Sequence, residues 1–153
     1  MFRIVLYQPE IPPNTGNIIR LTANTGSTLH LVKPLGFEMT DTRLRRAGLD
    51  YKNLVHVNIH ESLTEALIGS APERVFAFST KGNRNYSEIT YRKGDVLLFG
   101  PETRGLPDDI RAQYTDTLLR IPMKRETRSL NLANAVAIAL YEGWRQLGFE
   151  SAT

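Results

Sequence analysis

Two segments near the end of the sequence combine residue types suited to binding a small molecule. Residues 99–107 carry Gly100 and Gly105, whose bare backbone can approach a ligand closely, with Glu102 between them. Residues 121–131 supply hydroxyl, amide and positively charged side chains. Each segment follows an apolar run and precedes a helical pattern. Ligands of α/β proteins collect at the carboxyl ends of strands, so we expect the two segments to form two walls of one pocket.

Taken singly, the polar side chains of these segments suit structural as well as functional roles. Glu102 is either a catalytic carboxylate or an acceptor of backbone N–H bonds that holds its own loop. Ser129 and Asn131 are equally suited to capping the helix that follows them. Arg20, in an earlier helical pattern, would ordinarily be a solvated surface charge. Only the combination of these residues supports a functional hypothesis.

The sequence disfavours several classes of chemistry. Without cysteine, the chain forms no disulfide and no thiolate zinc site. The histidines His30, His56 and His60 lie in or at the ends of expected strands and lack the spacing of metal ligands, so we expect no metal. There is no nucleophile-elbow serine and no Walker lysine motif, and the glycines of residues 100–105 do not follow the dinucleotide fingerprint.

Composition and length describe an ordinary globular chain. Its 153 residues are 41% hydrophobic and 23% charged, which predicts one domain over residues 1–153. The first residues do not resemble a signal peptide, and no apolar run approaches the ~20 residues of a membrane helix. We therefore expect a cytoplasmic protein. The net charge of +3 is a mild bias toward polyanions, concentrated in residues 41–52 and 120–128.

Short apolar runs alternate with helical patterns along the whole chain. The runs show little polar alternation, which is typical of strands covered on both faces. The pattern predicts an α/β fold, a mostly parallel sheet flanked by helices. The expected strands are residues 3–7, 28–33, 54–59, 74–79, 96–100 and 117–121, and the expected helices are residues 14–24, 41–47, 62–68, 108–114 and 130–147.

The first and last helices carry the clearest local signals. Two prolines precede Asn14, which we expect to cap the first helix. In the last helix Ile138 and Tyr141 begin a second apolar face, which is either buried within the chain or covered by a second copy of it. We favour self-association. The main apolar stripe of this helix is predicted to comprise Leu130, Ala133, Ala137, Leu140, Trp144 and Leu147, widened by Val136.

Three groups of residues together resemble the three motifs of the SPOUT RNA 2′-O-methyltransferases. They are residues 14–20, residues 99–107, and residues 121–123 with 128–135. Residues 8–14 and 44–51 are similar to one branch in particular, the bacterial tRNA (cytidine/uridine-34)-2′-O-methyltransferases. The resemblance spans nearly the whole chain.

This resemblance implies a SPOUT α/β-knot, in which the C-terminal part forms a deep trefoil knot that general topology rules would disfavour. It also implies a homodimer that binds S-adenosylmethionine in the knot and methylates the ribose 2′-OH of the wobble nucleotide in leucine tRNA anticodon loops. The implied cofactor-binding residues are Phe78, Thr80, Gly100, Glu102, Gly105, Leu119, Ile121, Ser129, Leu130 and Asn134.

The same resemblance makes Arg20 the principal catalytic candidate. A guanidinium essentially never loses its proton, so we expect Arg20 to anchor a phosphate and orient the hydroxyl, with Asn14 positioning the arginine or the ribose. The expected tRNA-binding residues are Arg43, Arg45, Arg46, Lys124, Arg125, Arg128 and Tyr141. Two alternatives remain at this point: a 2′-O-methyltransferase for another tRNA or rRNA site, or a non-catalytic RNA-binding module on the same fold.

Overall fold

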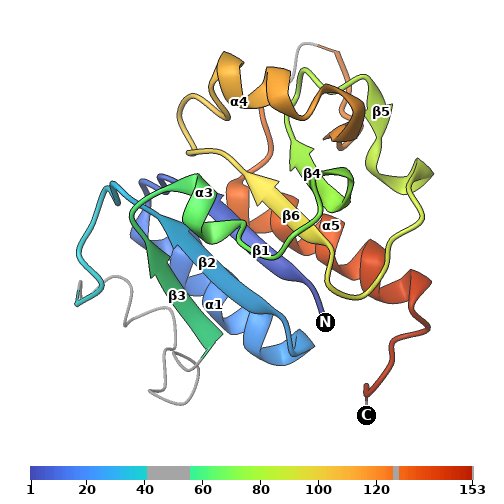
Figure 1. Cartoon of the computed structure of the whole chain (residues 1–153), viewed down its shortest axis with the longest axis horizontal. Coiled ribbons are helices and arrows are strands. Elements are labelled where there is room, and N and C mark those ends of the chain that lie inside the picture. The colour runs from blue at the N-terminus through green and yellow to red at the C-terminus, as the bar shows by residue number, and fades with distance from the viewer. Residues whose placement is uncertain (41–55, 126–127, 153) are drawn as a thin grey trace.

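A sheet of seven parallel strands forms the centre of the molecule, in a computed structural model that describes residues 1–40, 56–125 and 128–152 (Figure 1). The strand order is β3-β2-β1-β6-β4-β7-β5, so the late strand β6 lies between two strands formed earlier in the sequence. The strands are β1 (Arg3–Tyr7), β2 (Thr28–Val32), β3 (Val57–His60), β4 (Val75–Phe78), β5 (Arg84–Asn85), β6 (Val96–Phe99) and β7 (Leu118–Arg120).

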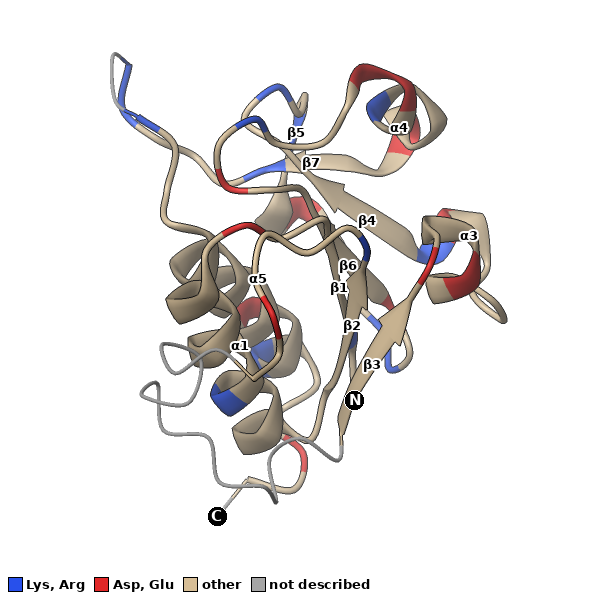
Figure 2. Ribbon diagram, turned by 90° about the vertical axis from the view of Figure 1, so that its left-hand side faces the viewer, with Lys and Arg blue, Asp and Glu red and all other residues tan. Residues whose placement is uncertain are grey.

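Helices cover both faces of this sheet. Helices α1 (Pro12–Thr25) and α5 (Leu132–Gln146) lie on one side, and α3 (Leu63–Ala66) and α4 (Asp108–Gln113) lie on the other, as Figure 2 shows with the sheet seen nearly edge-on. Short 3-10 turns at Pro72–Arg74, Tyr86–Glu88 and Thr115–Thr117 connect the strands. The α/β architecture expected from the sequence is confirmed. None of the helices in the described part of the chain is long and apolar enough to cross a membrane.

The molecule has two hydrophobic clusters, one on each face of the sheet, because side chains alternate between the faces along each strand. In β6, Leu97 and Phe99 pack with the α1 and α5 side, while Val96 and Leu98 pack with the α3 and α4 side. All four side chains are buried, which accounts for the uninterrupted apolar runs of the sequence. The sheet is therefore a central layer with hydrophobic packing on both faces.

Most element bounds agree with the sequence-based prediction to within two residues. β1 begins and ends where expected, whereas residues 54–55 of the third expected strand and the whole expected helix 41–47 lie outside the described residues. Strand β5 was missed because it has only two residues, both polar, and pairs with β7 at the edge of the sheet.

The start of α1 differs from the prediction. Ile11, and not Asn14, occupies the N-cap position, and the two prolines form the first helical positions. Proline suits the first turn of a helix because that turn needs no backbone N–H and because its φ is already helical. Asn14 is thereby moved into the helix, and its side chain is free to make tertiary contacts.

The buried face of α5 is also shifted relative to the expected stripe. The helix starts at Leu132, so Leu130 lies before it and is 38% exposed. The buried residues of the helix are Leu132, Val136, Ala139, Leu140, Gly143 and Trp144. The prediction was thus correct for Val136, Leu140 and Trp144, and Ala133 and Leu147 pack against the same core while only partly buried. Ala137 is also only partly buried. The trefoil knot stays a prediction from the resemblance.

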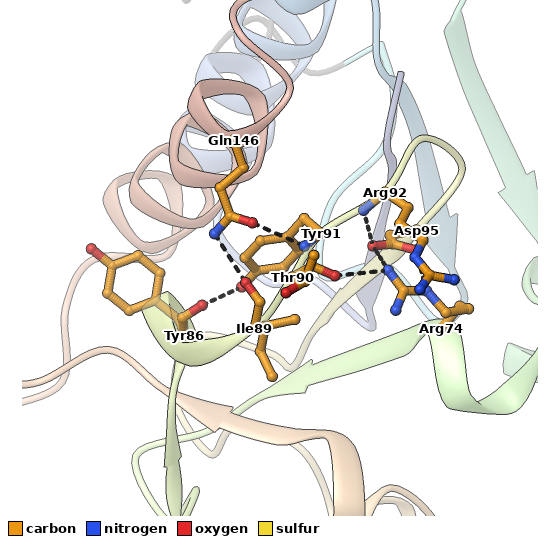
Figure 3. A network of polar contacts seen from close by, with 8 residues as sticks. All are labelled: Arg74, Tyr86, Ile89, Thr90, Tyr91, Arg92, Asp95 and Gln146. Atoms are coloured by element: carbon orange, nitrogen blue, oxygen red, sulfur yellow. Dashed lines mark hydrogen bonds and ion pairs between the residues drawn. The ribbon is translucent and has the colours of Figure 1, made fainter.

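An ion pair between Arg74 and the buried Asp95 lies at the amino ends of β4 and β6 (Figure 3). Asp95, 1% exposed, accepts hydrogen bonds from the Arg74 side chain and from the backbone N–H of Arg92. Beside it, Gln146 of α5 accepts from the backbone N–H of Tyr91 and donates to the carbonyl of Ile89. These contacts attach the segment before β6 to both β4 and α5.

Candidate active site

A cavity of about 570 Å³ opens at the carboxyl ends of β4, β6 and β7. Its wall consists of the loops that follow these three strands, of the segment that leads into α5, and of residues in α4 and at the starts of α1 and α5. Phe78 and Phe99, the last residues of β4 and β6, stack at a centroid distance of 4.6 Å and form an apolar part of the wall. The volume suits a ligand of cofactor size. The two segments expected to form one pocket do so.

Most of the expected cofactor-binding residues meet in this cavity, and two do not. Leu119 does not line it; the side chain is fully buried in the core and its carbonyl accepts a 2.9 Å bond from the N–H of Ser79. Asn134 is exposed on α5. The residues from the prediction that do line the cavity are Phe78, Thr80, Gly100, Glu102, Gly105, Ile121, Ser129 and Leu130.

Gly100 has a steric role in the cavity wall. A Cβ atom at this position would lie 2.2 Å from the backbone nitrogen of Leu106 and 2.4 Å from the carbonyl carbon of Gly105. The loop therefore folds back onto its own start, and only glycine permits that approach. The result is a tight loop that exposes backbone groups to the cavity.

Glu102 holds the start of α1. Its carboxylate accepts hydrogen bonds from the backbone N–H groups of Glu10 at 2.8 Å and Ile11 at 3.1 Å, and from the Asn14 side chain at 3.1 Å. Backbone N–H groups at a helix start lack partners within the helix, and a carboxylate there is also favoured by the helix dipole. Of the two roles left open for Glu102, the geometry matches the structural one.

Asn14 connects Glu102 to the last helix. Its amide nitrogen donates to Glu102, and its amide oxygen accepts a 2.8 Å bond from the side chain of Asn131. Asn131 is the N-cap of α5 and accepts from the N–H groups of Ala133 and Asn134. Asn14 is only 6% exposed. The chain Glu102–Asn14–Asn131, which we call the polar relay, joins the three motifs that the sequence singled out.

Arg20 lies apart from this arrangement. Its side chain is exposed, does not line the cavity, and makes no hydrogen bond or ion pair with any described residue. Arg20 follows Asn14 by six residues, which places it about 9 Å further along the helix and about 1.7 turns around it. The two side chains therefore leave the helix in different directions. One copy of the chain therefore does not bring Arg20 and the cavity together.

The residues expected to bind tRNA fall into three groups. Arg43, Arg45 and Arg46 lie outside the described residues. Lys124, Arg125 and Arg128 are exposed in the segment between β7 and α5. Tyr141 is 43% exposed on α5, in edge-to-face contact with Trp144, and does not line the cavity.

The sequence did not single out a second contact between the cavity loop and the start of α1. Thr103 donates to the Glu10 carboxylate from its hydroxyl at 2.7 Å and from its N–H at 3.1 Å. The Thr103 hydroxyl bond is the main cause of a lowered pKa of Glu10, and the charge of Arg104 adds to it. Arg104 also donates to Gln8 at 3.0 Å. No local pattern signals contacts between residues more than 90 positions apart.

Among the described residues, no group of three or more His, Asp or Glu side chains could hold a metal ion.

Comparison with known proteins identifies the family. The chain is 56% identical over 153 residues to the tRNA (cytidine(34)-2′-O)-methyltransferase of Methylovorus glucosotrophus, with 99% of both chains covered. A solved structure concerned with the 2-OH methylation of C/U34 on tRNA is 49% identical, with a TM-score of 0.88 and 98% of both chains covered.

A more distant solved structure is an AdoMet-bound rRNA methyltransferase from Sinorhizobium meliloti. It is 28% identical with a TM-score of 0.80, over 95% of this chain and 56% of that one. The family model for the SpoU rRNA methylases matches residues 1–141. The resemblance inferred from the three motifs is thereby confirmed, and the chain belongs to the SpoU methylase family.

Proposed function

We propose that this chain transfers the methyl group of S-adenosylmethionine to the ribose 2′-OH of nucleotide 34 in tRNA. The observation that carries the proposal is the cavity at the carboxyl ends of β4, β6 and β7, in which residues from the second and third motifs meet. The Methylovorus relative, which shares more than half of its residues with this chain, is named for that reaction. We further propose leucine tRNAs as substrates, with the reaction in the cytoplasm.

The cavity suits S-adenosylmethionine better than a nucleotide cofactor with phosphates. Phe78, Ile121 and Leu130 offer apolar surface for a purine ring, and the backbone near Gly100 can read its polar edge. A Walker-type phosphate cradle is not required, because the cofactor carries no phosphate. When bound, it supplies an electrophilic methyl group on a sulfonium.

The residues of the chain would mainly position the acceptor, because methyl transfer is an in-line displacement. Arg20 is proposed to hold the phosphate next to the target ribose through two parallel hydrogen bonds and thereby to orient the 2′-hydroxyl. The hydroxyl proton would leave to phosphate or water, since a guanidinium does not accept protons. The polar relay would hold the loop of Glu102 and the start of α5 in place around the cavity.

The isolated position of Arg20 supports a homodimer as the functional unit. Because Arg20 does not reach the cavity of its own chain, a second copy would supply it. Exposed apolar side chains at Ile11, Met123, Leu130 and Tyr141 offer surface for such an association. An active site shared between two copies would be lost when the dimer dissociates.

Incubation with labelled S-adenosylmethionine and total tRNA, followed by mapping of the modified nucleotide, tests this function. We expect label on the ribose of nucleotide 34 of leucine tRNAs, and none with Arg20→Ala. Arg92→Gln, an exposed arginine at the other end of the sheet, serves as a control that should retain activity. Label in rRNA alone, at another tRNA position, or in no RNA would overturn the proposal.

A further inference from the structure

A second cavity, of about 600 Å³, opens at the carboxyl ends of β1, β2 and β3. It lies on the face of the sheet that α3 and α4 cover in Figure 2, and residues of both helices line it. The apolar part of its lining consists of Val32, Leu63, Leu67, Ile68 and Ile110. The volume suits a ligand of the size of a nucleoside, and the methyl transfer proposed above leaves this cavity without an occupant.

Two tyrosines offer aromatic surface to this cavity. Tyr7 ends β1 and Tyr114 is the C-cap of α4; both line the cavity and pack, only partly buried, against the hydrophobic cluster on this face of the sheet. Neither hydroxyl has a hydrogen-bond partner among the described residues, although the hydroxyl of a partly buried tyrosine usually finds one. Burial raises the pKa of Tyr114, so its hydroxyl stays a neutral donor.

The polar part of the lining favours an uncharged ligand. Lys33 and Glu61 are the two charged residues of the lining, and they form an ion pair of 2.6 Å, so neither offers an unbalanced charge to a phosphate. The remaining polar groups include the side-chain amides of Gln8 and Gln113. Tyrosine rings stack on nucleobases, and amides both donate to and accept from a base edge. The chemistry of the cavity therefore matches a nucleobase.

This cavity adjoins the candidate active site. The side-chain oxygen of Gln8 accepts a 3.0 Å bond from Arg104, which lines the first cavity. Gln8 has a φ of 50°, which is uncommon for a residue other than glycine, and its N–H donates to the carbonyl of Val32 at 2.9 Å. Backbone outliers of this kind cluster at functional sites. The two cavities thus open side by side at one edge of the sheet.

We propose that the second cavity, which we call the base pocket, takes up one base of the RNA substrate other than base 34 while the ribose of nucleotide 34 enters the candidate active site. Bases of an unpaired loop can be splayed out and stacked on aromatic side chains. A base held in the base pocket would fix the position of the strand relative to the methyl donor. The proposal rests on the methyltransferase function above, because it assigns how the same substrate is read.

Variants of Tyr114 test the base pocket through binding of an anticodon stem-loop. Tyr114→Leu keeps an apolar side chain and removes the ring, and stacking on an aromatic ring contributes about 1–3 kcal/mol per base. We therefore expect affinity for the stem-loop to fall about 5- to 150-fold. Tyr114→Phe keeps the ring and should lose less. Phe149→Leu is the control, since Phe149 is an exposed aromatic residue that lines neither cavity.

Stem-loops that lack single bases show whether an RNA base occupies the pocket. Removing the base at one loop position other than 34 should weaken binding to wild type by a similar factor and should weaken binding to Tyr114→Leu no further. S-adenosylmethionine affinity should be unchanged in every variant. Additive losses at every loop position, equal losses in Tyr114→Leu and Phe149→Leu, or loss of cofactor affinity in Tyr114→Leu would each overturn the proposal.

Free nucleosides distinguish a base of the RNA substrate from a separate small ligand. Adenosine or uridine that binds wild type but not Tyr114→Leu, without coupling to any loop position, would make the cavity an effector site and overturn the proposal. Methylation of nucleotide 34 by the wild type is scored separately. A failed base pocket therefore leaves the proposed function standing.

Discussion

The side-chain amide of Asn131 donates a 2.8 Å hydrogen bond to the side-chain oxygen of Asn14, across 117 residues of sequence. Asn131 caps α5, while Asn14 lies in the first turns of α1 and donates in turn to Glu102. The starts of the two helices on one face of the sheet, and the loop after β6, are thus held by three side chains. All three residues line the cavity, so their hydrogen bonds hold part of its wall in place.

We expect the two asparagines to be energetically coupled. Asn131→Ala removes a cap and should lower the free energy of unfolding by about 1–2 kcal/mol. Asn14→Ala removes the hydrogen bonds to Glu102 and Asn131, whose side chains still reach solvent, at a cost of about 0.5–1.5 kcal/mol for each bond. The double variant should lose about 1 kcal/mol less than the sum. Urea unfolding of the three variants measures this coupling. Asn17→Ala, an exposed asparagine on the same helix, is the control, and strict additivity of Asn14 and Asn131 would contradict the relay.

Gly100→Ala should prevent formation of the cavity loop. The added Cβ would lie 2.2 Å from the backbone nitrogen of Leu106, which cannot move away as a flexible side chain could. Gly148→Ala is a matched control: its φ of 67° disfavours alanine, but no atom lies within 4 Å of the added Cβ. We expect a cost of about 1 kcal/mol at Gly148. Calorimetry should find S-adenosylmethionine binding lost at Gly100 and kept at Gly148; equal binding in both would show that the loop tolerates the change.

Replacing the buried Asp95 should lower the free energy of unfolding more than the asparagine variants above. Asp95→Asn leaves the Arg74 guanidinium without its carboxylate and weakens the bond to the Arg92 N–H (Figure 3). Breaking one side of a buried ion pair typically costs about 3–5 kcal/mol, and the 25% exposure of the Arg74 side chain argues for the lower end. Thermal and urea unfolding measure the loss. Asp116→Asn, at an exposed position, should change stability little, and similar losses at both positions would refute the assignment.

Stability should decrease on mild acidification because of His30. Burial lowers the pKa of His30 to about 4, aided by the positive charge of Arg3 and by His60, whose ring stacks on it. As the pH falls through about 6.5, the unfolded chain takes up a proton that the folded chain does not, so stability is lost from there down to about pH 4. Urea midpoints between pH 7 and 4.5 should fall less steeply in His30→Gln than in wild type. The exposed His56 provides the control, and an unchanged slope in His30→Gln would contradict this origin.

Arg20 should affect turnover and leave cofactor binding intact. Because Arg20 does not line the cavity, Arg20→Ala should retain S-adenosylmethionine affinity while methyl transfer falls about 100-fold or more through loss of positioning. Arg20→Lys should rescue little, since an ammonium cannot form the two parallel bonds of a guanidinium. Single-turnover rates at saturating cofactor measure the effect. Near wild-type rates in both variants would remove Arg20 from the mechanism.

The sequence predicts those parts of the molecule whose signals are local. The apolar run of β6 identifies a strand covered on both faces, and Gly100 and Gly105 identify a loop with close backbone approach. The bond between Asn14 and Asn131 has no such signal, because its existence depends on how two helices pack. For the same reason the sequence assigns the side chain of Asn14 to the helix cap, and the pairing of the two-residue strand β5 with β7 has no local signal either.

The position of β6 also constrains the order in which the molecule can be built. Its neighbours β1 and β4 leave the ribosome before it. They do not pair with each other in the folded sheet, because β6 lies between them. The strands on the two sides of β6 can therefore join only after residue 99 has emerged, and the polar relay can form only after residue 131 has emerged. A nascent chain stopped earlier would expose unpaired parallel strand edges, which are prone to wrong association. The cavity at the strand carboxyl ends is thus among the last features of this protein to form during synthesis.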